Sequence, residues 1–193
     1  MTESGDRPLL FLDVDGPLIP FGSDHGYPAT FKTHEMRPEP WWVAENPLLV
    51  RLNPAHGPRL LALPCDLVWA TAWGSDANDL IGPLIGLPEL PVVIGPDDDQ
   101  DQDQNQNDAP AHASPDANDS GLHWKTPLLL DWAAGRPFIW VDDEITDADR
   151  TWVTQNHPHP TLLHHVNHRI GLTEADFATL TTWLQAPQAP QGR

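Results

Sequence analysis

The sequence predicts a single α/β domain with a mostly parallel sheet that helices cover on both faces. Short apolar runs of strand length alternate with segments of helical periodicity along most of the 193 residues. The apolar runs carry few polar side chains, as expected of strands buried on both faces. The length and the 39% apolar content suit one core with roughly five strands.

The strands are expected where a short apolar run stops at turn residues. The first run ends at Asp13-Val14-Asp15-Gly16, which indicates a buried strand that leads into a tight turn. The five predicted strands are Leu9 to Val14, Asp66 to Thr71, Leu90 to Ile94, Phe138 to Val141 and Thr161 to Val166.

Helices are expected between the strands and after the last one. The segment from Asn46 to Leu63 has helical leucine spacing, but Pro54 and Pro58 must break it into pieces. Thr173 and Asp176 resemble a capping box before the final helix. The other predicted helices run from Ser75 or Asp76 to about Ile85, from about Thr126 to Ala134, and from about Asp147 to Thr154.

Three segments are expected to lack regular structure. Residues 17 to 46 read as a proline- and aromatic-rich loop over the end of the first strand. Residues 95 to 121 read as a disordered, acidic and polar insertion, because they hold almost no large apolar side chain. Residues 186 to 193 are expected to form a disordered tail.

The charge excludes some functions. The formal net charge of −18 argues against a broad basic surface for nucleic acid. Eight aspartates lie in the insertion, so the remainder carries −18 + 8 = −10. No apolar run approaches the length of a membrane span, and the single cysteine, Cys65, cannot form an internal disulfide. These features predict a cytoplasmic protein that does not engage the membrane.

Polar residues with chemical potential follow the predicted strands. Ligands of open parallel sheets bind outside the carboxyl ends of the strands, so these positions matter most. They are Asp13 and Asp15 after the first strand, Thr71 at the end of the second, Lys125 at a helix start, and Asp142-Asp143 after the fourth.

This set supplies each requirement of phosphoryl transfer from a monoester. Asp13 can attack phosphorus, and Asp15 can protonate the leaving oxygen and then activate water. Lys125 and the Thr71 hydroxyl can hold phosphoryl oxygens. Mg²⁺, held by Asp13, a main-chain oxygen and the Asp142-Asp143 pair, would offset the repulsion between carboxylates and phosphate.

The order of these motifs resembles the haloacid dehalogenase-like (HAD) superfamily over about Leu9 to Trp152. The resemblance implies a magnesium-dependent phosphatase with a Rossmann-like, doubly wound sheet. It also implies that the main-chain carbonyl of Asp15 is a metal ligand. The phrases Trp69-Ala-Thr-Ala-Trp73 and Trp140-Val-Asp-Asp143 are similar to a small actinobacterial branch akin to the phosphatase-like domain of RNA-repair proteins.

The chain departs from the family pattern at two positions and shows no large cap domain. Pro17 follows the glycine of the first motif, where the family usually has threonine or valine. Val141 replaces a glycine before the acids of the fourth motif. Two registers therefore remain open, either Asp142 with Asp143, or Asp143 with Asp147. A site without a lid should accept large substrates.

Substrate contacts are expected from Gly16, Trp73 and Asn78, and Trp124 is a further candidate for stacking on a base or sugar. The expected substrate is a small phosphorylated compound or a phosphate-ended nucleic acid. The alternative is a catalytically silent interaction module that binds a basic partner through the acidic insertion.

The histidines from 157 to 168 favour loop and strand surfaces over a zinc site, because a strand sends alternate side chains to opposite faces.

Overall fold

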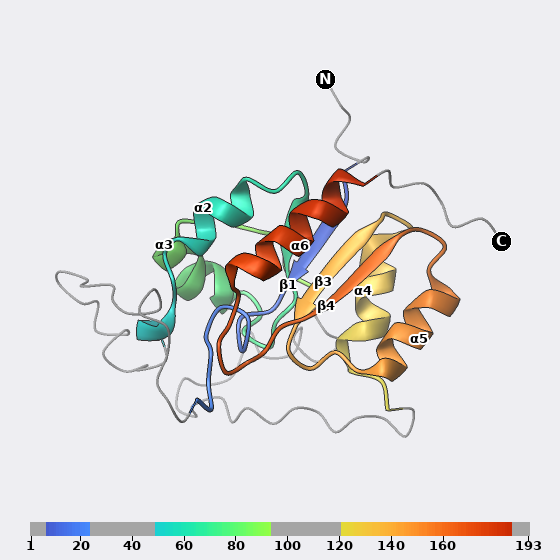
Figure 1. Ribbon diagram of the computed structural model, residues 1–193, viewed down its shortest axis with the longest axis horizontal. Helices are drawn as coiled ribbons and strands as arrows, with labels where there is room; N and C mark the ends of the chain where they lie inside the picture. The colour runs from blue at the N-terminus through green and yellow to red at the C-terminus, as the bar shows by residue number, and fades with distance from the viewer. Residues whose placement is uncertain (1–6, 24–48, 94–120, 187–193) are drawn as a thin grey trace, which may run out of the picture.

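The computed structural model describes residues 7–23, 49–93 and 121–186. Within these ranges four parallel strands form one sheet in the order β2-β1-β3-β4 (Figure 1). Leu12 at the end of β1 lies opposite Trp69 of β2 and Val141 of β3. The predicted α/β class with a parallel sheet is confirmed. The strands are β1 (Leu9–Leu12), β2 (Asp66–Trp69), β3 (Phe138–Asp142) and β4 (Thr161–His165).

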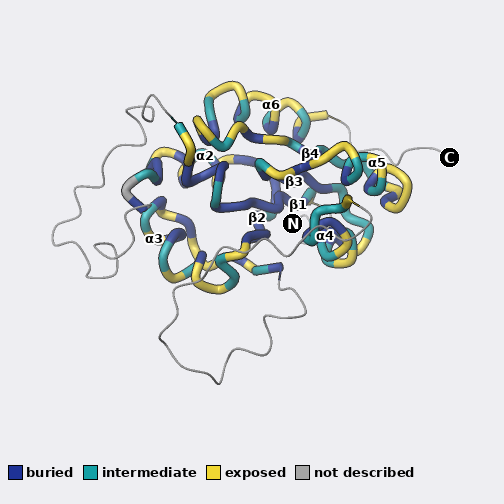
Figure 2. Tube along the Cα trace, turned by 90° about the horizontal axis from the view of Figure 1, so that it is seen from below, coloured by how far each residue is buried: buried dark blue, intermediate teal, exposed yellow. Residues whose placement is uncertain are grey.

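Helices pack on both faces of this sheet. In Figure 2 the buried strands lie between α6 on one side and α4 on the other. The 3-10 turn η2 is Leu49–Arg51 and the π-helical turn η3 is Ala77–Ile81. The α-helices are α2 (His56–Leu61), α3 (Gly82–Ile85), α4 (Lys125–Ala133), α5 (Asp147–Asn156) and α6 (Glu174–Gln185).

The continuous apolar runs follow from this two-sided burial. In β1, Leu10 and Leu12 join a cluster with residues of α2, α3 and α6, whereas Leu9 and Phe11 join a second cluster with residues of α4 and α5. Alternate side chains of a strand point to opposite faces, so a strand between two helical layers needs apolar residues at every position.

The predicted strand from Leu90 to Ile94 was wrong in extent. The structure has one isolated bridge, between Val92 and Trp69, and Ile94 lies outside the described residues. Pro91 has no N–H to donate, so the ladder cannot extend toward Leu90. The side chain of Asn78 instead bonds both the N–H and the C=O of Leu90, at 2.9 and 2.8 Å.

The predicted helix ending near Ile85 is not a regular α-helix. It consists of the π-helical turn η3 followed by the short α3. Pro83 lies in the first turn of α3, and its missing N–H interrupts the i to i−4 hydrogen bonds of a continuous helix. Asp76 takes the N-cap position of η3 but makes no side-chain capping bond.

The remaining predicted helices are confirmed to within a turn. The leucine-rich segment before β2 is broken near Pro54 into η2 and α2, whereas Pro58 lies within the first turn of α2, where its missing N–H interrupts no helical bond. The predicted start at Asn46 lies outside the described residues. The capping box of α6 is present, since the carboxylate of Asp176 accepts from both the N–H and the hydroxyl of Thr173. Among the described residues, no helix is long and apolar enough to cross a membrane.

Most of three segments predicted to lack regular structure falls outside the described residues. These are residues 24–48 of the loop, 94–120 around the acidic insertion and 187–193 of the tail.

Candidate functional site

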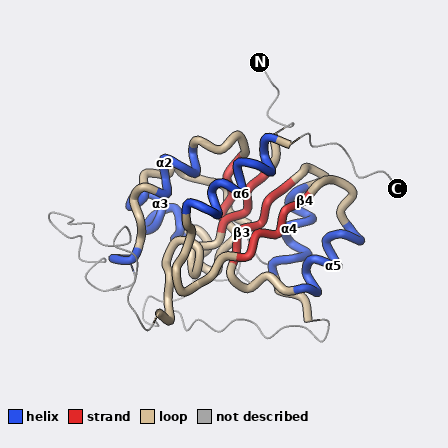
Figure 3. The backbone as a smooth tube through the Cα atoms, in the orientation of Figure 1, coloured by secondary structure: helices blue, strands red, loops and turns tan. Residues whose placement is uncertain are grey.

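The connections that follow the strands gather at one end of the sheet (Figure 3). Because β1 and β3 are parallel neighbours, the residues just after β1 meet those that end β3. The N–H of Asp13 donates to the C=O of Val141 at 3.1 Å, which continues the ladder by one residue beyond β1. Asp13 and Asp142 are thereby brought to the same edge of the sheet.

Lys125 joins these two acids. Its Nζ lies 3.0 Å from Oδ2 of Asp13 and 2.7 Å from Oδ2 of Asp142. All three residues are buried, with 3% of Lys125, 5% of Asp13 and none of Asp142 exposed. A buried ammonium requires paired counter-charges, and the first residue of α4 places it between them.

The carboxylate of Asp142 is held on both oxygens. Oδ2 also accepts from the indole Nε1 of Trp140 at 3.1 Å, and Oδ1 accepts from the N–H of Glu144 at 2.9 Å. These donors fix its rotamer, so Asp142 is a rigid component of the site.

The next acid, Asp143, packs against the turn after β1. Gly16 has a φ of +78°, a left-handed conformation that glycine adopts without strain. A Cβ atom at Gly16 would collide with the carboxyl group of Asp143. Glycine is therefore required both by the backbone and by the close approach of this side chain.

Asp13, Asp142 and Asp143 form a group that can hold a cation. Their ligand oxygens all lie within 4.8 Å of one another. An all-oxygen donor set of this kind fits a hard divalent cation such as Mg²⁺. Among the described residues this oxygen-only group contains Asp142 and Asp143, whereas Asp147 is the first residue of α5 and is not part of the group.

Burial and repulsion between neighbouring carboxylates disfavour the ionised forms of Asp13 and Asp143. Burial raises the pKa of Asp13 above its usual range, with Asp142 and Asp15 adding repulsion against the opposing effect of Lys125. Burial and the neighbouring Asp142 likewise raise the pKa of Asp143 to about 7. For Lys125, burial lowers the pKa, but the two carboxylates outweigh burial and hold it above its ordinary value. A cation at the acids would relieve their repulsion.

Asp15 is oriented by Trp73. The indole Nε1 of Trp73 donates to Oδ2 of Asp15 at 2.9 Å, and the N–H of Trp73 donates to the hydroxyl of Thr71 at 3.4 Å. Thr71 is 2% exposed and follows β2 by two residues. A hydroxyl that accepts one bond can still donate its own proton, so Thr71 retains a donor for a ligand. Trp73, predicted to touch substrate, thus also positions Asp15.

His123 forms a second polar pair beside the site, with Glu144. The N–H of Lys125 donates to Nδ1 of His123 at 3.2 Å, so the ring proton lies on Nε2, which is 3.0 Å from Oε2 of Glu144. This hydrogen bond holds the pKa of Glu144 below its usual range. Ligand atoms of His123, Asp142 and Glu144 also lie within 4.8 Å of one another.

Asp149 ties together the two segments that carry these residues. Oδ1 accepts from the N–H of His123 at 2.9 Å and the hydroxyl of Thr126 at 2.6 Å, and Oδ2 accepts from the N–H and hydroxyl of Thr146 at 2.8 and 2.6 Å. The residue is fully buried. Burial raises its pKa, but these hydrogen bonds outweigh burial and hold the pKa below its usual range.

Four residues of the site were missed by the sequence reasoning: His123, Trp140, Glu144 and Asp149. Thr146 and Asp149 have the same capping-box spacing that identified Thr173 and Asp176, so the pattern for Asp149 was readable. The contact between His123 and Glu144 joins separate elements and has no local signal.

Other predicted positions serve different purposes. Asn78 bonds Leu90 and also accepts from the indole of Trp69 at 2.9 Å, so its amide braces β2 against the following segment. The ring of Trp124 lies 5.7 Å from Nζ of Lys125, a cation–π distance.

Among the described residues, the groups of possible metal ligands do not include the histidines from 157 to 168. His157, expected at the surface, is instead buried; its Nε2 lies 3.0 Å from the carbonyl of Arg136.

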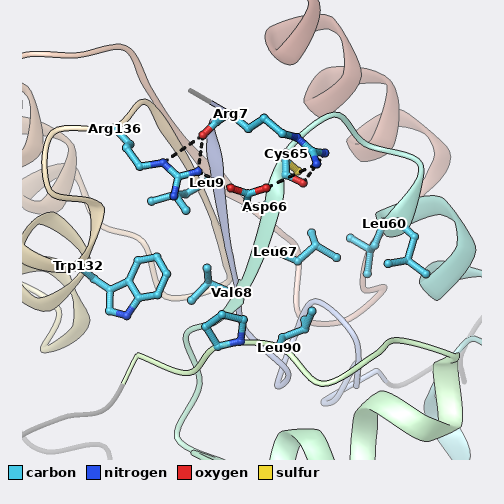
Figure 4. Close-up of a pocket in the computed structure, with 12 residues that line it drawn as sticks. Arg7, Leu9, Leu60, Cys65, Asp66, Leu67, Val68, Leu90, Trp132 and Arg136 are labelled. Carbon is cyan, nitrogen blue, oxygen red and sulfur yellow. Dashed lines mark hydrogen bonds and ion pairs between the residues drawn. The ribbon is translucent and has the colours of Figure 1, made fainter. Parts of the chain in front are cut away.

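A pocket of about 430 Å³ lies near the amino end of β2, away from the carboxyl ends of the strands (Figure 4). Arg7 and Arg136 both pair with Asp66 there, and both guanidinium groups also donate to main-chain carbonyls. Both guanidinium groups of this pocket therefore already have partners within the protein.

Comparison with protein-family models, curated protein sequences and solved structures yields no match to this chain.

Proposed function

We propose that the chain is a magnesium-dependent phosphohydrolase of the HAD-like type, with a doubly wound sheet, that hydrolyses a phosphomonoester through an aspartyl-phosphate. The observation that carries the proposal is the buried bridge of Lys125 between Asp13 and Asp142, with Asp143 beside them. The ammonium group of Lys125 lies beside three carboxylates at the carboxyl ends of β1 and β3, and this combination of charges matches the needs of phosphoryl transfer.

In the first half-reaction a carboxylate oxygen of Asp13 attacks phosphorus and the ester oxygen departs. Asp15 gives its proton to that oxygen, while Trp73 keeps the Asp15 carboxyl oriented. Lys125 and Thr71 supply positive charge and a hydrogen-bond donor for the phosphoryl oxygens. In the second half-reaction Asp15 takes a proton from water, which attacks phosphorus, releases inorganic phosphate and restores Asp13.

The residues present fit Mg²⁺. Asp13, Asp142 and Asp143 offer only oxygen ligands, and burial together with repulsion from neighbouring carboxylates raises the pKa of Asp13 and of Asp143. When bound, the ion supplies charge neutralisation and polarises a phosphoryl oxygen. With that charge present, Asp13 would be ionised and nucleophilic near neutral pH.

The test is turnover of an aryl phosphate by the full chain with Mg²⁺ and with a chelator. Asp13→Asn should abolish Mg²⁺-dependent hydrolysis, whereas Asp147→Asn should retain it as a matched control on a neighbouring acid. Borohydride reduction during turnover should convert the acyl-phosphate at Asp13 to homoserine, detected by peptide mass. Full activity of Asp13→Asn would contradict the assignment of the nucleophile.

Deletion of residues 97 to 119 distinguishes an enzyme from an interaction module that acts through the acidic insertion. A phosphohydrolase with the proposed site should keep its kcat and its magnesium requirement after this deletion. If neither the full chain nor the deleted form hydrolyses an ester, and the deletion abolishes binding of a basic partner, the chain is an interaction module instead.

A further inference from the structure

We propose that Phe21 and His168 form a stacking surface for a planar ring in the leaving group of the substrate, which makes an aromatic or nucleoside phosphate the preferred ester. This rests on the proposed function. The two rings are stacked, with centroids 4.8 Å apart and an angle of 18° between their planes. Phe21 is 39% exposed and the His168 side chain is 38% exposed, so the pair is accessible to a ligand.

The stack adjoins the acidic group. Nδ1 of His168 lies 3.8 Å from Oδ2 of Asp143, whose ligand oxygens lie within 4.8 Å of those of Asp13. Pairwise contacts of 4.8 Å or less thus link Asp13 to Phe21 through Asp143 and His168.

The surface is held in place by contacts between two segments of chain. The N–H of Phe21 donates to the carbonyl of His168 at 2.8 Å, and the N–H of Leu172 donates to the carbonyl of Pro17 at 2.9 Å. The guanidinium of Arg169 also donates to the carbonyl of Gly22. A ligand therefore meets a preorganised surface, which reduces the entropy lost on binding.

Single exposed apolar residues are normal on a protein surface, so the exposure of Phe21 alone would carry no argument. Leu61, at 49% exposure, is such a residue, on the outer part of α2. Phe21 differs because its ring is stacked in parallel on a second ring that adjoins Asp143. A flat face of this kind suits a π-system, which binds by stacking without requiring a specific hydrogen-bond pattern.

The experiment compares a nucleoside monophosphate with the ringless ester glycerol phosphate, in wild type, Phe21→Ala, Phe21→Trp and the control Leu61→Ala. Stacking on one aromatic side chain corresponds to about 5- to 100-fold in affinity. Phe21→Ala should lower kcat/KM for the nucleotide by that range, mainly through KM, and leave glycerol phosphate within about twofold. Phe21→Trp should keep the preference, and Leu61→Ala should change neither substrate.

Calorimetric binding of the same two esters to Asp13→Asn and to Asp13→Asn/Phe21→Ala, with Mg²⁺, gives a readout that needs no turnover. If removal of the Phe21 ring weakens binding of the nucleotide but not of glycerol phosphate, the stacking surface is supported. Equal losses for both esters, or none, overturn it. Failure of wild type to hydrolyse any ester overturns the proposed phosphohydrolase, and the binding ratio still decides the stacking surface.

Discussion

Nζ of Lys125 lies 2.7 Å from the fully buried carboxylate of Asp142, which makes this lysine part of the folded core as well as of the site. Removal of one partner from a buried ion pair leaves an uncompensated charge and costs about 3–5 kcal/mol. The replacement of this lysine should therefore affect stability as well as chemistry.

We expect Lys125→Met to lower the free energy of unfolding by about 3 kcal/mol, measured by urea denaturation with a chelator present. Glu174→Gln, which removes the exposed partner of Arg59, should cost no more than about 1 kcal/mol under the same conditions. Added Mg²⁺ should recover part of the loss in Lys125→Met, because a cation at the acids replaces some of the missing positive charge. Equal effects of the two substitutions would contradict a buried role for Lys125.

Asp143 should be required for the effect of Mg²⁺ on stability. A ligand that binds only the native state stabilises it by about 2.7 kcal/mol at a concentration 100 times its Kd. Thermal unfolding of wild type should shift upward as Mg²⁺ is added, and Asp143→Asn should lose most of this shift. Asp147→Asn should keep it, because Asp147 lies outside the acidic group. Loss of the shift in both Asp143→Asn and Asp147→Asn would instead support the register of Asp143 with Asp147.

Gly16 and Gly74 provide a matched pair of glycines with positive φ. Gly16 has a φ of +78° and Gly74 a φ of +53°, but a Cβ at Gly74 meets nothing within 4 Å, whereas one at Gly16 collides with Asp143. Gly74→Ala should cost only the backbone strain of about 1 kcal/mol. Gly16→Ala should cost more and should also weaken the Mg²⁺-dependent shift in Tm, because Asp143 must move. Equal losses of stability in the two variants, with an unchanged Mg²⁺-dependent shift in Tm, would disprove the close approach of Gly16 to Asp143.

Much of the sheet was readable from the sequence because burial on both faces leaves an unambiguous signal. The run Leu9–Leu12 is apolar at each position, and parallel pairing with β3 then brings Asp13 beside Asp142. The strand expected at Leu90 failed because its backbone groups are taken by Asn78, a contact across 12 residues that no local pattern contains. The proline beside it was the signal against a strand.

The acids of the candidate site lie at or shortly after the ends of β1 and β3, positions that the sequence pattern marks, but the residues that orient them have no such local signal. Trp73 reaches Asp15 from 58 positions away, and Glu144 meets His123 across 21. Such pairs depend on how loops pack at the end of the sheet, which neither periodicity nor motif spacing encodes.

Asp149 and Asp176 test whether a capping box also positions the site. Each aspartate accepts from the N–H and the hydroxyl of its threonine N-cap, but only Asp149 also holds the segment that carries Lys125. Replacement by asparagine removes one accepting oxygen, and each variant should lose about 1–3 kcal/mol of stability. Only Asp149→Asn should also weaken the Mg²⁺-dependent shift in Tm. An equal Mg²⁺-dependent shift in Tm in Asp149→Asn and Asp176→Asn would show that Asp149 acts only as a helix cap.

The stability of the fold should fall in acid because of His56. This residue is 3% exposed between α2 and α6, where its ring lies 5.6 Å from that of Phe177. Burial, with the nearby charge of Arg59, lowers its pKa to about 4 from an ordinary value of 6.5. The unfolded chain therefore binds a proton at this residue before the native state does.

The sign of the His56 effect follows directly. Its contribution is fully present above pH 6.5 and is lost as the pH falls from 6.5 to about 4, in total about 3 kcal/mol. Urea denaturation at pH 7 and at pH 4.5 should show a loss of this order from His56 in wild type and a smaller pH dependence in His56→Gln. The variant separates His56 from the carboxylates that titrate in the same range, including Asp143 with its raised pKa, since it leaves all of them in place. An unchanged pH dependence in His56→Gln would show that the pKa of His56 is the same in the native and the unfolded states.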